Sequence, residues 1–152
     1  MRRIYLRFTN SNSIASKLVE WWTGHWASHV DIVVGRGSYI GSDILTGVAI
    51  IGDEDYINRT EFYYVEVTED QYFKFMRIAY SQLGKDYDTW ALVGNMFRRN
   101  WQQTDKWFCS ELIAHCFQQC GAIVTYSKSN RVTPADLIRN PMLIPFGQVP
   151  PI

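Results

Sequence analysis

The chain has 152 residues, and its 15 basic side chains balance its 15 acidic ones, so the formal net charge is zero. Hydrophobic residues make up 47% of the chain, which supplies enough apolar material for a buried core and excludes a disordered tail. This length predicts a single domain over residues 1–152. The balanced charge disfavours a nucleic-acid-binding protein, and no apolar run approaches the ~20 residues of a membrane span.

The N-terminus lacks the apolar run of a signal peptide. Arg2 and Arg3 precede alternating residues, and the stretch 9–11 is polar. We therefore expect synthesis and folding in the cytoplasm, with later delivery to the cell wall or to a virion left open.

Alternating apolar and polar residues dominate the first half of the chain. They predict strands over residues 4–8, 29–34, 39–44, 48–51 and 62–67. Apolar residues at helical spacing over 14–22 predict one helix, which ends at Gly24. The stretch 35–38, Gly-Arg-Gly-Ser, is typical of a hairpin turn between two of these strands.

The second half is expected to be mainly helical. Thr68 and Gln71 have the spacing of a capping box, and the helix that they begin stops at Gly84. Further helices are predicted over 89–97, over the stretch that ends at Gly121, and from Thr133 with Pro134 in the first turn; the tail 141–150 is expected to be irregular. Segregated strands and helices predict an α+β fold, with a small antiparallel sheet packed against helices.

Cys109 is the candidate nucleophile because it stands where a helix is expected to begin. A thiol at a helix N-terminus meets free N–H groups and the positive end of the helix dipole, which favour the thiolate. The same amides can stabilise an oxyanion. Cys116 and Cys120 lie four residues apart in the helical pattern and are expected in the core. Three clustered cysteines predict no disulfide framework, and their spacing with His115 matches no usual zinc site.

A nucleophilic cysteine needs a base, which is normally a histidine. His115 lies six residues along the same helix as Cys109 and is expected to face away from it, while His25 lies in an expected turn. His29 begins a strand that would hold its ring at a fixed height, so we prefer it as the general base. The spacing alone does not prove that His29 and Cys109 meet.

Four short blocks together resemble a known family. They are Ser28-His29-Val30, Leu83-Gly84 with Tyr87-Asp88, the run Trp-Phe-Cys-Ser-Glu-Leu around Cys109, and Val132-Thr133-Pro134 with Asp136-Leu137. In this order the chain resembles the permuted NlpC-type papain-like cysteine hydrolases over about residues 11–140. YiiX-like proteins, phage- and prophage-encoded hydrolases and lecithin retinol acyltransferase belong to this group, in which the histidine precedes the cysteine.

The resemblance implies that Cys109 is the nucleophile, that His29 is the general base, and that the fold is a permuted papain-like one. It also implies that Tyr87 lies near the active site, where it either contacts substrate or is a buried ring. Family members usually carry a third polar residue about twelve positions after the histidine, but here that position is Gly41. A glycine cannot orient an imidazole, so the third role is vacant or displaced.

Other residues that share a face of the sheet with His29 are candidates for the third, orienting role. Asp31 lies two residues after His29, so both side chains share one face of the strand. Ser42 joins that face if the hairpin loop is even, and Asp43 joins it if the loop is odd or bulged. We prefer Asp31 because its position does not depend on the loop; a solvated strand carboxylate is the alternative.

The resemblance implies a cysteine peptidase or amidase that needs no cofactor and acts on a peptide-like amide, for example in the bacterial cell wall. One alternative is an acyltransferase or thioesterase that uses the same cysteine on acyl groups. Another is a decayed, phage-associated binding module, because Gly41 cannot orient the histidine. The sequence does not assign the oligomeric state.

Overall fold

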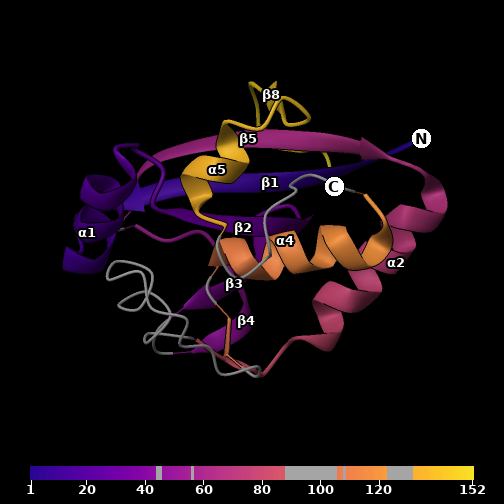
Figure 1. The fold of residues 1–152 in the computed structure, drawn as a ribbon, viewed down its shortest axis with the longest axis horizontal. Coiled ribbons are helices and arrows are strands. Elements are labelled where there is room, and N and C mark those ends of the chain that lie inside the picture. The colour runs from indigo at the N-terminus through magenta and orange to yellow at the C-terminus, as the bar shows by residue number, and fades with distance from the viewer. Residues whose placement is uncertain (44–45, 56, 88–105, 108, 123–131) are drawn as a thin grey trace.

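An antiparallel sheet is the frame of the molecule (Figure 1). The computed structural model describes residues 1–43, 46–55, 57–87, 106–107, 109–122 and 132–152. Within these ranges the sheet has six strands in the order β4-β3-β2-β1-β5-β8. They are β1 (Arg2–Ser11), β2 (His29–Gly35), β3 (Ser38–Asp43), β4 (Gly47–Ile51), β5 (Ile57–Val67) and β8 (Ile144–Phe146).

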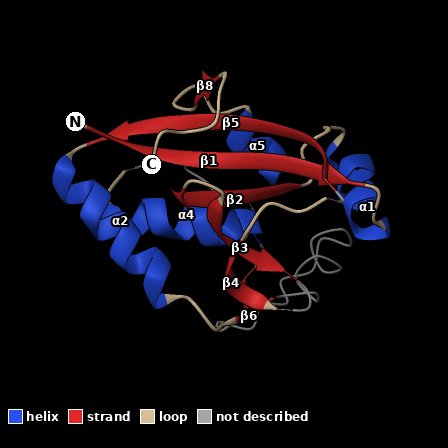
Figure 2. Ribbon diagram, turned by 180° about the vertical axis from the view of Figure 1, so that it is seen from behind, coloured by secondary structure: helices blue, strands red, loops and turns tan. Residues whose placement is uncertain are grey.

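Helices cover the sheet and connect its strands. They are α1 (Ile14–Thr23), α2 (Glu69–Ser81), α4 (Cys109–Cys120) and α5 (Pro134–Ile138). Helices α2 and α4 lie side by side against the sheet, and α1 forms the connection between β1 and β2 at one end of it (Figure 2). Two short strands, β6 (Asp86–Tyr87) and β7 (Lys106–Trp107), pair in parallel and form a separate two-stranded sheet. The α+β prediction is confirmed.

Most of the predicted helix ends agree with the structure because they depend on local chemistry, but α2 ends at Ser81, before the predicted stop at Gly84. The Thr68 hydroxyl accepts a hydrogen bond from the Gln71 amide, and the Gln71 side chain accepts one from the Thr68 amide, which completes the capping box of α2. Thr133 caps α5 in the same way, with Pro134 in the first turn. Helix α1 ends at Gly24, which has the left-handed conformation that glycine favours (φ 64°).

Several boundaries were wrong because long-range pairing extends the strands. Strands β1 and β5 pair along the whole of β1, and both are longer than the alternating pattern indicated. The tail was expected to be irregular, but residues Ile144–Phe146 pair with β5 as β8. The sequence also did not predict β6 and β7. The helix predicted over 89–97 lies outside the described residues.

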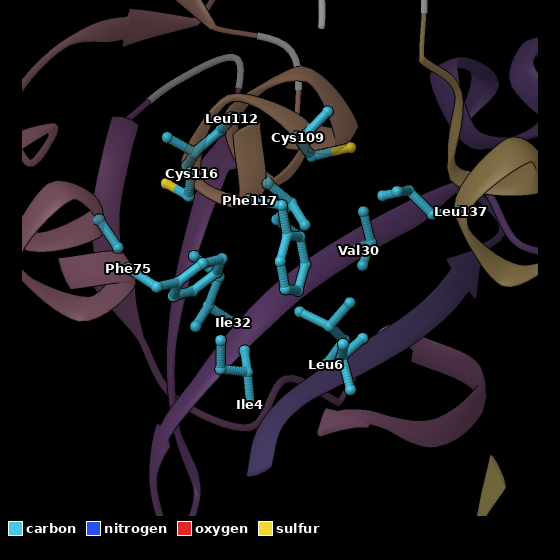
Figure 3. Close-up of a cluster of buried hydrophobic side chains, with 14 of the residues drawn as sticks. Ile4, Leu6, Val30, Ile32, Phe75, Cys109, Leu112, Cys116, Phe117 and Leu137 are labelled. Atoms are coloured by element: carbon cyan, nitrogen blue, oxygen red, sulfur yellow. The ribbon is translucent and has the colours of Figure 1, made fainter. Parts of the chain in front are cut away.

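The two faces of the sheet have different contents. One face carries apolar residues that pack with α2 and α4 in the main core, among them Leu6, Val30 and Ile32 (Figure 3). On α4, Leu112, Cys116 and Phe117 belong to this core, as does Cys109. The opposite face carries a smaller cluster of Tyr5, Val33 and Tyr39. None of the described helices is long and apolar enough to cross a bilayer.

Phe117 holds α4 in place, since its ring is fully buried with its centroid 4.6 Å from that of Phe75 on α2. Phe117→Ala should lower the free energy of unfolding by about 3–5 kcal/mol, because it leaves a cavity between the two helices. Urea denaturation measures this loss. The exposed Phe73, also on α2, provides the control, and Phe73→Ala should change stability by less than about 1 kcal/mol. Equal losses for both variants would contradict the packing of α4 on α2.

Candidate active site

His29 and Asp31 form a direct contact at the start of β2. His29 Nε2 lies 2.6 Å from Asp31 Oδ1, a short distance for a hydrogen bond between these groups. Strand alternation puts both side chains on one face, as the sequence predicted. Asp31 is fully buried, whereas 28% of the His29 side chain is exposed. The alternative of a solvated strand carboxylate at Asp31 is therefore wrong.

The second oxygen of Asp31 is bound by Arg7. Strands β1 and β2 pair in a register that sets Arg7 opposite Asp31. Arg7 Nε and Nη2 donate to Asp31 Oδ2 at 3.0 Å and 2.7 Å, and the arginine side chain is 2% exposed. The carboxylate is thus divided between two partners, with Oδ1 on His29 and Oδ2 on Arg7. A buried charge with partners on both oxygens avoids most of the cost of leaving water.

These contacts shift the pKa values of both members of the pair. Burial alone would raise the pKa of Asp31, but His29 and Arg7 outweigh burial and hold it below its usual value. For His29, burial alone would lower the pKa, but the Asp31 carboxylate and the neighbouring Cys109 raise it well above 6.5. The pair therefore favours an imidazolium beside a carboxylate at neutral pH.

Gly41 supplies the space that the Asp31 carboxylate fills. Ile32 pairs with Ile40 across β2 and β3, which brings Gly41 next to Asp31. A Cβ atom at position 41 would lie 2.2 Å from Asp31 Oδ1, closer than any non-bonded contact permits. The position where the resemblance expected a third polar residue is thus occupied by a carboxylate from the neighbouring strand.

The hairpin between β2 and β3 determines which of Ser42 and Asp43 shares the face of the sheet that carries Asp31. The register shifts by one residue between Val33 and Gly35, which is the bulged case. Ser42 is buried and alternates with Gly41, so it lies on the face opposite Asp31 and is not the third residue. The side chain of Asp43 lies outside the described part of the chain.

Cys109 is the first residue of α4, as the sequence predicted, and it is 1% exposed. Figure 3 shows it on the part of α4 that meets Val30 of β2. Its side chain lies near enough to His29 to interact electrostatically with the imidazole and to raise its pKa. The next residue, Ser110, fixes the beginning of the helix because its hydroxyl donates to the Val132 carbonyl. The structure therefore brings Cys109, His29 and Asp31 together.

The other histidines have different surroundings. His25 lies in the turn after α1, where its Nδ1 accepts a hydrogen bond from the Ala27 amide, and burial lowers its pKa. His115 lies along α4, and burial and the Lys85 charge lower its pKa. Tyr87 lies in β6, but its side chain is outside the described part of the structure. Among the described residues, no three His, Cys, Asp or Glu side chains gather closely enough to hold a metal ion.

Arg7 is the residue that sequence reasoning missed. It belongs to no motif, and it alternates in β1 like any outward-facing residue of a half-exposed strand. Its only signal is a charged residue between Leu6 and Phe8, in a strand that proves to be buried on both faces at this point. Only the pairing of β1 with β2 reveals the partner of Arg7.

A solved structure resembles this fold closely. A crystal structure described as that of metalloprotein yiiX from Escherichia coli O157:H7 superposes with a TM-score of 0.68 and 18% sequence identity, over 98% of each chain. At this identity the likeness shows the fold, which is the permuted papain-like one that the sequence resemblance implied. No curated protein matches the sequence significantly.

The sequence itself places the chain in a family. Residues 6–143 match the family described as the permuted papain-like amidase enzyme, YaeF/YiiX, C92 family. The match begins within β1 and ends just before β8, so it includes β2, β3, β4 and β5 in full, together with α1, α2, α4 and α5. The chain therefore belongs to the YaeF/YiiX family of permuted papain-like amidases, and this family assignment makes it a cysteine peptidase or amidase.

Proposed function

We propose that the protein hydrolyses an amide bond with Cys109 as nucleophile, His29 as general base and acid, and Asp31 as the group that orients His29. The observation that carries this proposal is the 2.6 Å contact between His29 and Asp31, beside a cysteine that begins a helix. Because Asp31 occupies Nε2, the other ring nitrogen, Nδ1, is left to exchange a proton with Cys109. This division of the imidazole between an orienting group and a nucleophile is what thiol hydrolysis requires.

The reaction follows from these groups. The Cys109 thiolate attacks the carbonyl carbon of the amide, and free N–H groups at the start of α4 hold the oxyanion that forms. The His29 imidazolium then gives its proton to the leaving nitrogen, the C–N bond breaks, and an acyl thioester remains on Cys109. Neutral His29 takes a proton from water, whose oxygen attacks the thioester. The acid leaves, and the thiolate and the imidazolium are restored.

Asp31 supports both steps without touching the substrate. A charged hydrogen bond to Nε2 fixes the ring orientation and stabilises the imidazolium that is needed before the leaving group departs. The vacancy at Gly41 therefore does not argue for a decayed binding module, because a carboxylate from β2 fills that space.

The substrate class rests on the resemblance to permuted papain-like cysteine hydrolases, among them phage- and prophage-encoded ones. We propose a peptide-like amide, such as a bacterial cell-wall peptide, with Tyr87 of β6 as a substrate contact beside the site. Acyl transfer or thioester cleavage would use the same thioester intermediate, so the choice of substrate separates these activities rather than the catalytic groups. A panel of cell-wall peptides and acyl esters therefore tests the proposal directly.

Cys109→Ala should reduce hydrolysis of the cleaved substrate at least about 1,000-fold, because no other group can form the thioester. Mass spectrometry of the muropeptide and ester panel measures the products. Cys116→Ala is the matched control, since this second buried cysteine of α4 should leave the rate unchanged. Hydrolysis by Cys109→Ala at the wild-type rate would refute the proposal, and cleavage of esters alone would favour the acyl-transfer alternative.

Selective alkylation provides a test that needs no substrate. Cys109, Cys116 and Cys120 are all buried, so selective labelling by iodoacetamide at pH 6–7 must reflect ionisation rather than exposure. Burial raises the pKa of Cys116 to about 12, which keeps this thiol protonated. We expect Cys109 alone to react, and His29→Ala to abolish the selectivity. Equal labelling of the three thiols in the wild-type protein would contradict a thiolate–imidazolium pair.

The pH response of His29 follows from the signs of its contacts. A raised pKa means that the imidazolium and its contribution to stability persist above pH 6.5 and are lost as the pH rises through the raised value. Asp31→Asn removes the carboxylate, so it should lower the titration midpoint of the His29 imidazole by about 1–3 pH units. Nitrogen-15 NMR of the histidine rings measures both midpoints. An unchanged midpoint in Asp31→Asn would show that the two groups are not coupled.

Gly41→Ala should disturb the site without a large change elsewhere, because the new Cβ would collide with the Asp31 carboxylate. We expect hydrolysis to fall about 100-fold or more, as misplacement of catalytic groups by about 1 Å does. Gly35→Ala in the same hairpin is the control, since its Cβ would meet Ser38 only at 3.6 Å. Equal activity of the two variants would indicate that Asp31 does not need this space.

A further inference from the structure

We infer that Arg7 is a positioning residue for the reaction, which it serves by holding Asp31 and, through Asp31, the imidazole of His29. The inference rests on the roles proposed above for His29 and Asp31. Within the described part of the chain, the hydrogen bonds and ion pairs of Arg7 go to Asp31 and Asp53 and not to Cys109 or His29, so its influence on the histidine must pass through the Asp31 carboxylate. Its part would be to decide which oxygen of Asp31 faces the histidine.

The first support is the way in which the carboxylate is shared. Both Arg7 nitrogens, Nε and Nη2, donate to the same oxygen of Asp31, Oδ2. The opposite oxygen, Oδ1, is thereby left to the imidazole. A carboxylate held by two donors on one oxygen cannot rotate without breaking both bonds. The arginine fork therefore fixes the direction of the bond between Asp31 and His29.

The second support is that Arg7 is itself held on its remaining sides. Its guanidinium carbon lies 3.6 Å from the centroid of the Tyr39 ring, a cation–π distance. Arg7 Nη1 lies 3.6 Å from Asp53 Oδ1, and the Tyr39 hydroxyl donates to the same oxygen at 2.8 Å. The guanidinium is thus clamped between β2, β3 and the segment after β4. A group fixed in this way transfers its own orientation to Asp31.

The third support is that stability alone does not explain the pair. A buried ion pair is often no more stable than well-packed apolar residues of similar volume, because both charges lose their hydration. The opposite face of the same strands carries such apolar residues, for example Leu6 opposite Ile32. Arg7 and Asp31 instead bring a net-neutral pair next to the partly exposed His29. This placement is expected of a group that serves the site.

Arg7 also tunes how tightly the pair of His29 and Asp31 binds its proton. Among the residues that the structure describes, the charged and titratable groups around His29 and Asp31 are Arg7 on β1, Tyr39 on β3, Asp53 after β4 and Cys109 on α4. Of these, Arg7 is the cation that touches the carboxylate. Removing its charge leaves Asp31 with His29 as the remaining cationic partner among these groups, so the imidazolium should bind its proton more tightly. Arg7→Met should therefore shift the His29 midpoint upward, opposite to the shift in Asp31→Asn.

Two variants of Arg7 separate charge from orientation in the full-length chain. Arg7→Met removes both the charge and the hydrogen bonds that orient Asp31. We expect it to raise the titration midpoint of the His29 imidazole, measured by nitrogen-15 NMR, by about one pH unit or more. Arg7→Lys keeps the charge but lacks the planar fork. It should keep the midpoint within about half a unit, while the proton on Nε2 exchanges with water about tenfold faster, because the carboxylate is no longer fixed. His29→Gln assigns the resonances.

Arg3 provides a matched control on the same strand. It contacts the carboxylate of Glu66 and the ring of Tyr64, as Arg7 contacts Asp31 and Tyr39, but it is exposed and far along β1 from the pair. Arg3→Met and Arg3→Lys should leave the His29 midpoint and the exchange rate unchanged. A merely structural role of Arg7 would lower the melting temperature without moving either quantity.

The outcomes distinguish this inference from the proposed function. Arg7→Met with an unchanged midpoint, or Arg7→Lys with wild-type exchange, overturns the positioning role even if Cys109 is the nucleophile. If Arg7→Met does not fold, the exchange rate in Arg7→Lys decides. If His29 responds to Arg7 as expected while Cys109→Ala leaves hydrolysis intact, the positioning role stands and the proposed function falls.

Discussion

The site depends on one constraint, which is that a fully buried carboxylate must have a partner on each oxygen. Asp31 satisfies it with His29 on one oxygen and Arg7 on the other. Both partners are fixed by the sheet, since His29 lies two residues away on β2 and Arg7 lies opposite on β1. Without either partner the carboxylate would carry an uncompensated charge in the interior, a cost of several kcal/mol. The residues that the two neighbouring strands place beside Asp31, Arg7 on β1 and Gly41 on β3, meet this requirement with a charge and with space.

The two faces of the same strands differ: one carries the main core, and the other carries the polar groups of the candidate site. The face with Leu6, Val30 and Ile32 packs on α4 and supplies the main core. The other face carries the ion pair of Arg7 and Asp31. The first residues of β2 and of α4, His29 and Cys109, meet where these layers end. Core packing therefore sets the distance between the histidine and the cysteine, while the polar face sets the orientation of the ring.

The features of this site that could be predicted from the sequence are those that depend on residues close together in the chain. The capping boxes at Thr68 and Thr133, the strand parity of His29 and Asp31, and the position of Cys109 at a helix start all depend on neighbours within a few residues. The pairing of Arg7 with Asp31 could not be predicted in this way, because it is set by the register of two strands and joins residues 24 positions apart in the chain. The bulge in the hairpin after β2 also decides which residue of β3 adjoins Asp31, and no local pattern specifies it. The same limitation explains β8, a strand that exists through its pairing with β5.

Gly41 and Asp31 are best understood as one feature rather than as a missing residue and a substitute. A side chain on β3 at position 41 and a carboxylate on β2 at position 31 would compete for the same space, since the Cβ of the one would lie 2.2 Å from Oδ1 of the other. A chain can therefore place a side chain at position 41 of β3 or a carboxylate at position 31 of β2, but not both. Placing it on β2 makes the distance to His29 a property of one strand's pleat, which varies little. That placement moves the carboxylate deeper into the sheet, however, and a buried carboxylate needs a second cation. The glycine at position 41 and the arginine at position 7 are thus the two requirements, one of space and one of charge, for an aspartate at position 31.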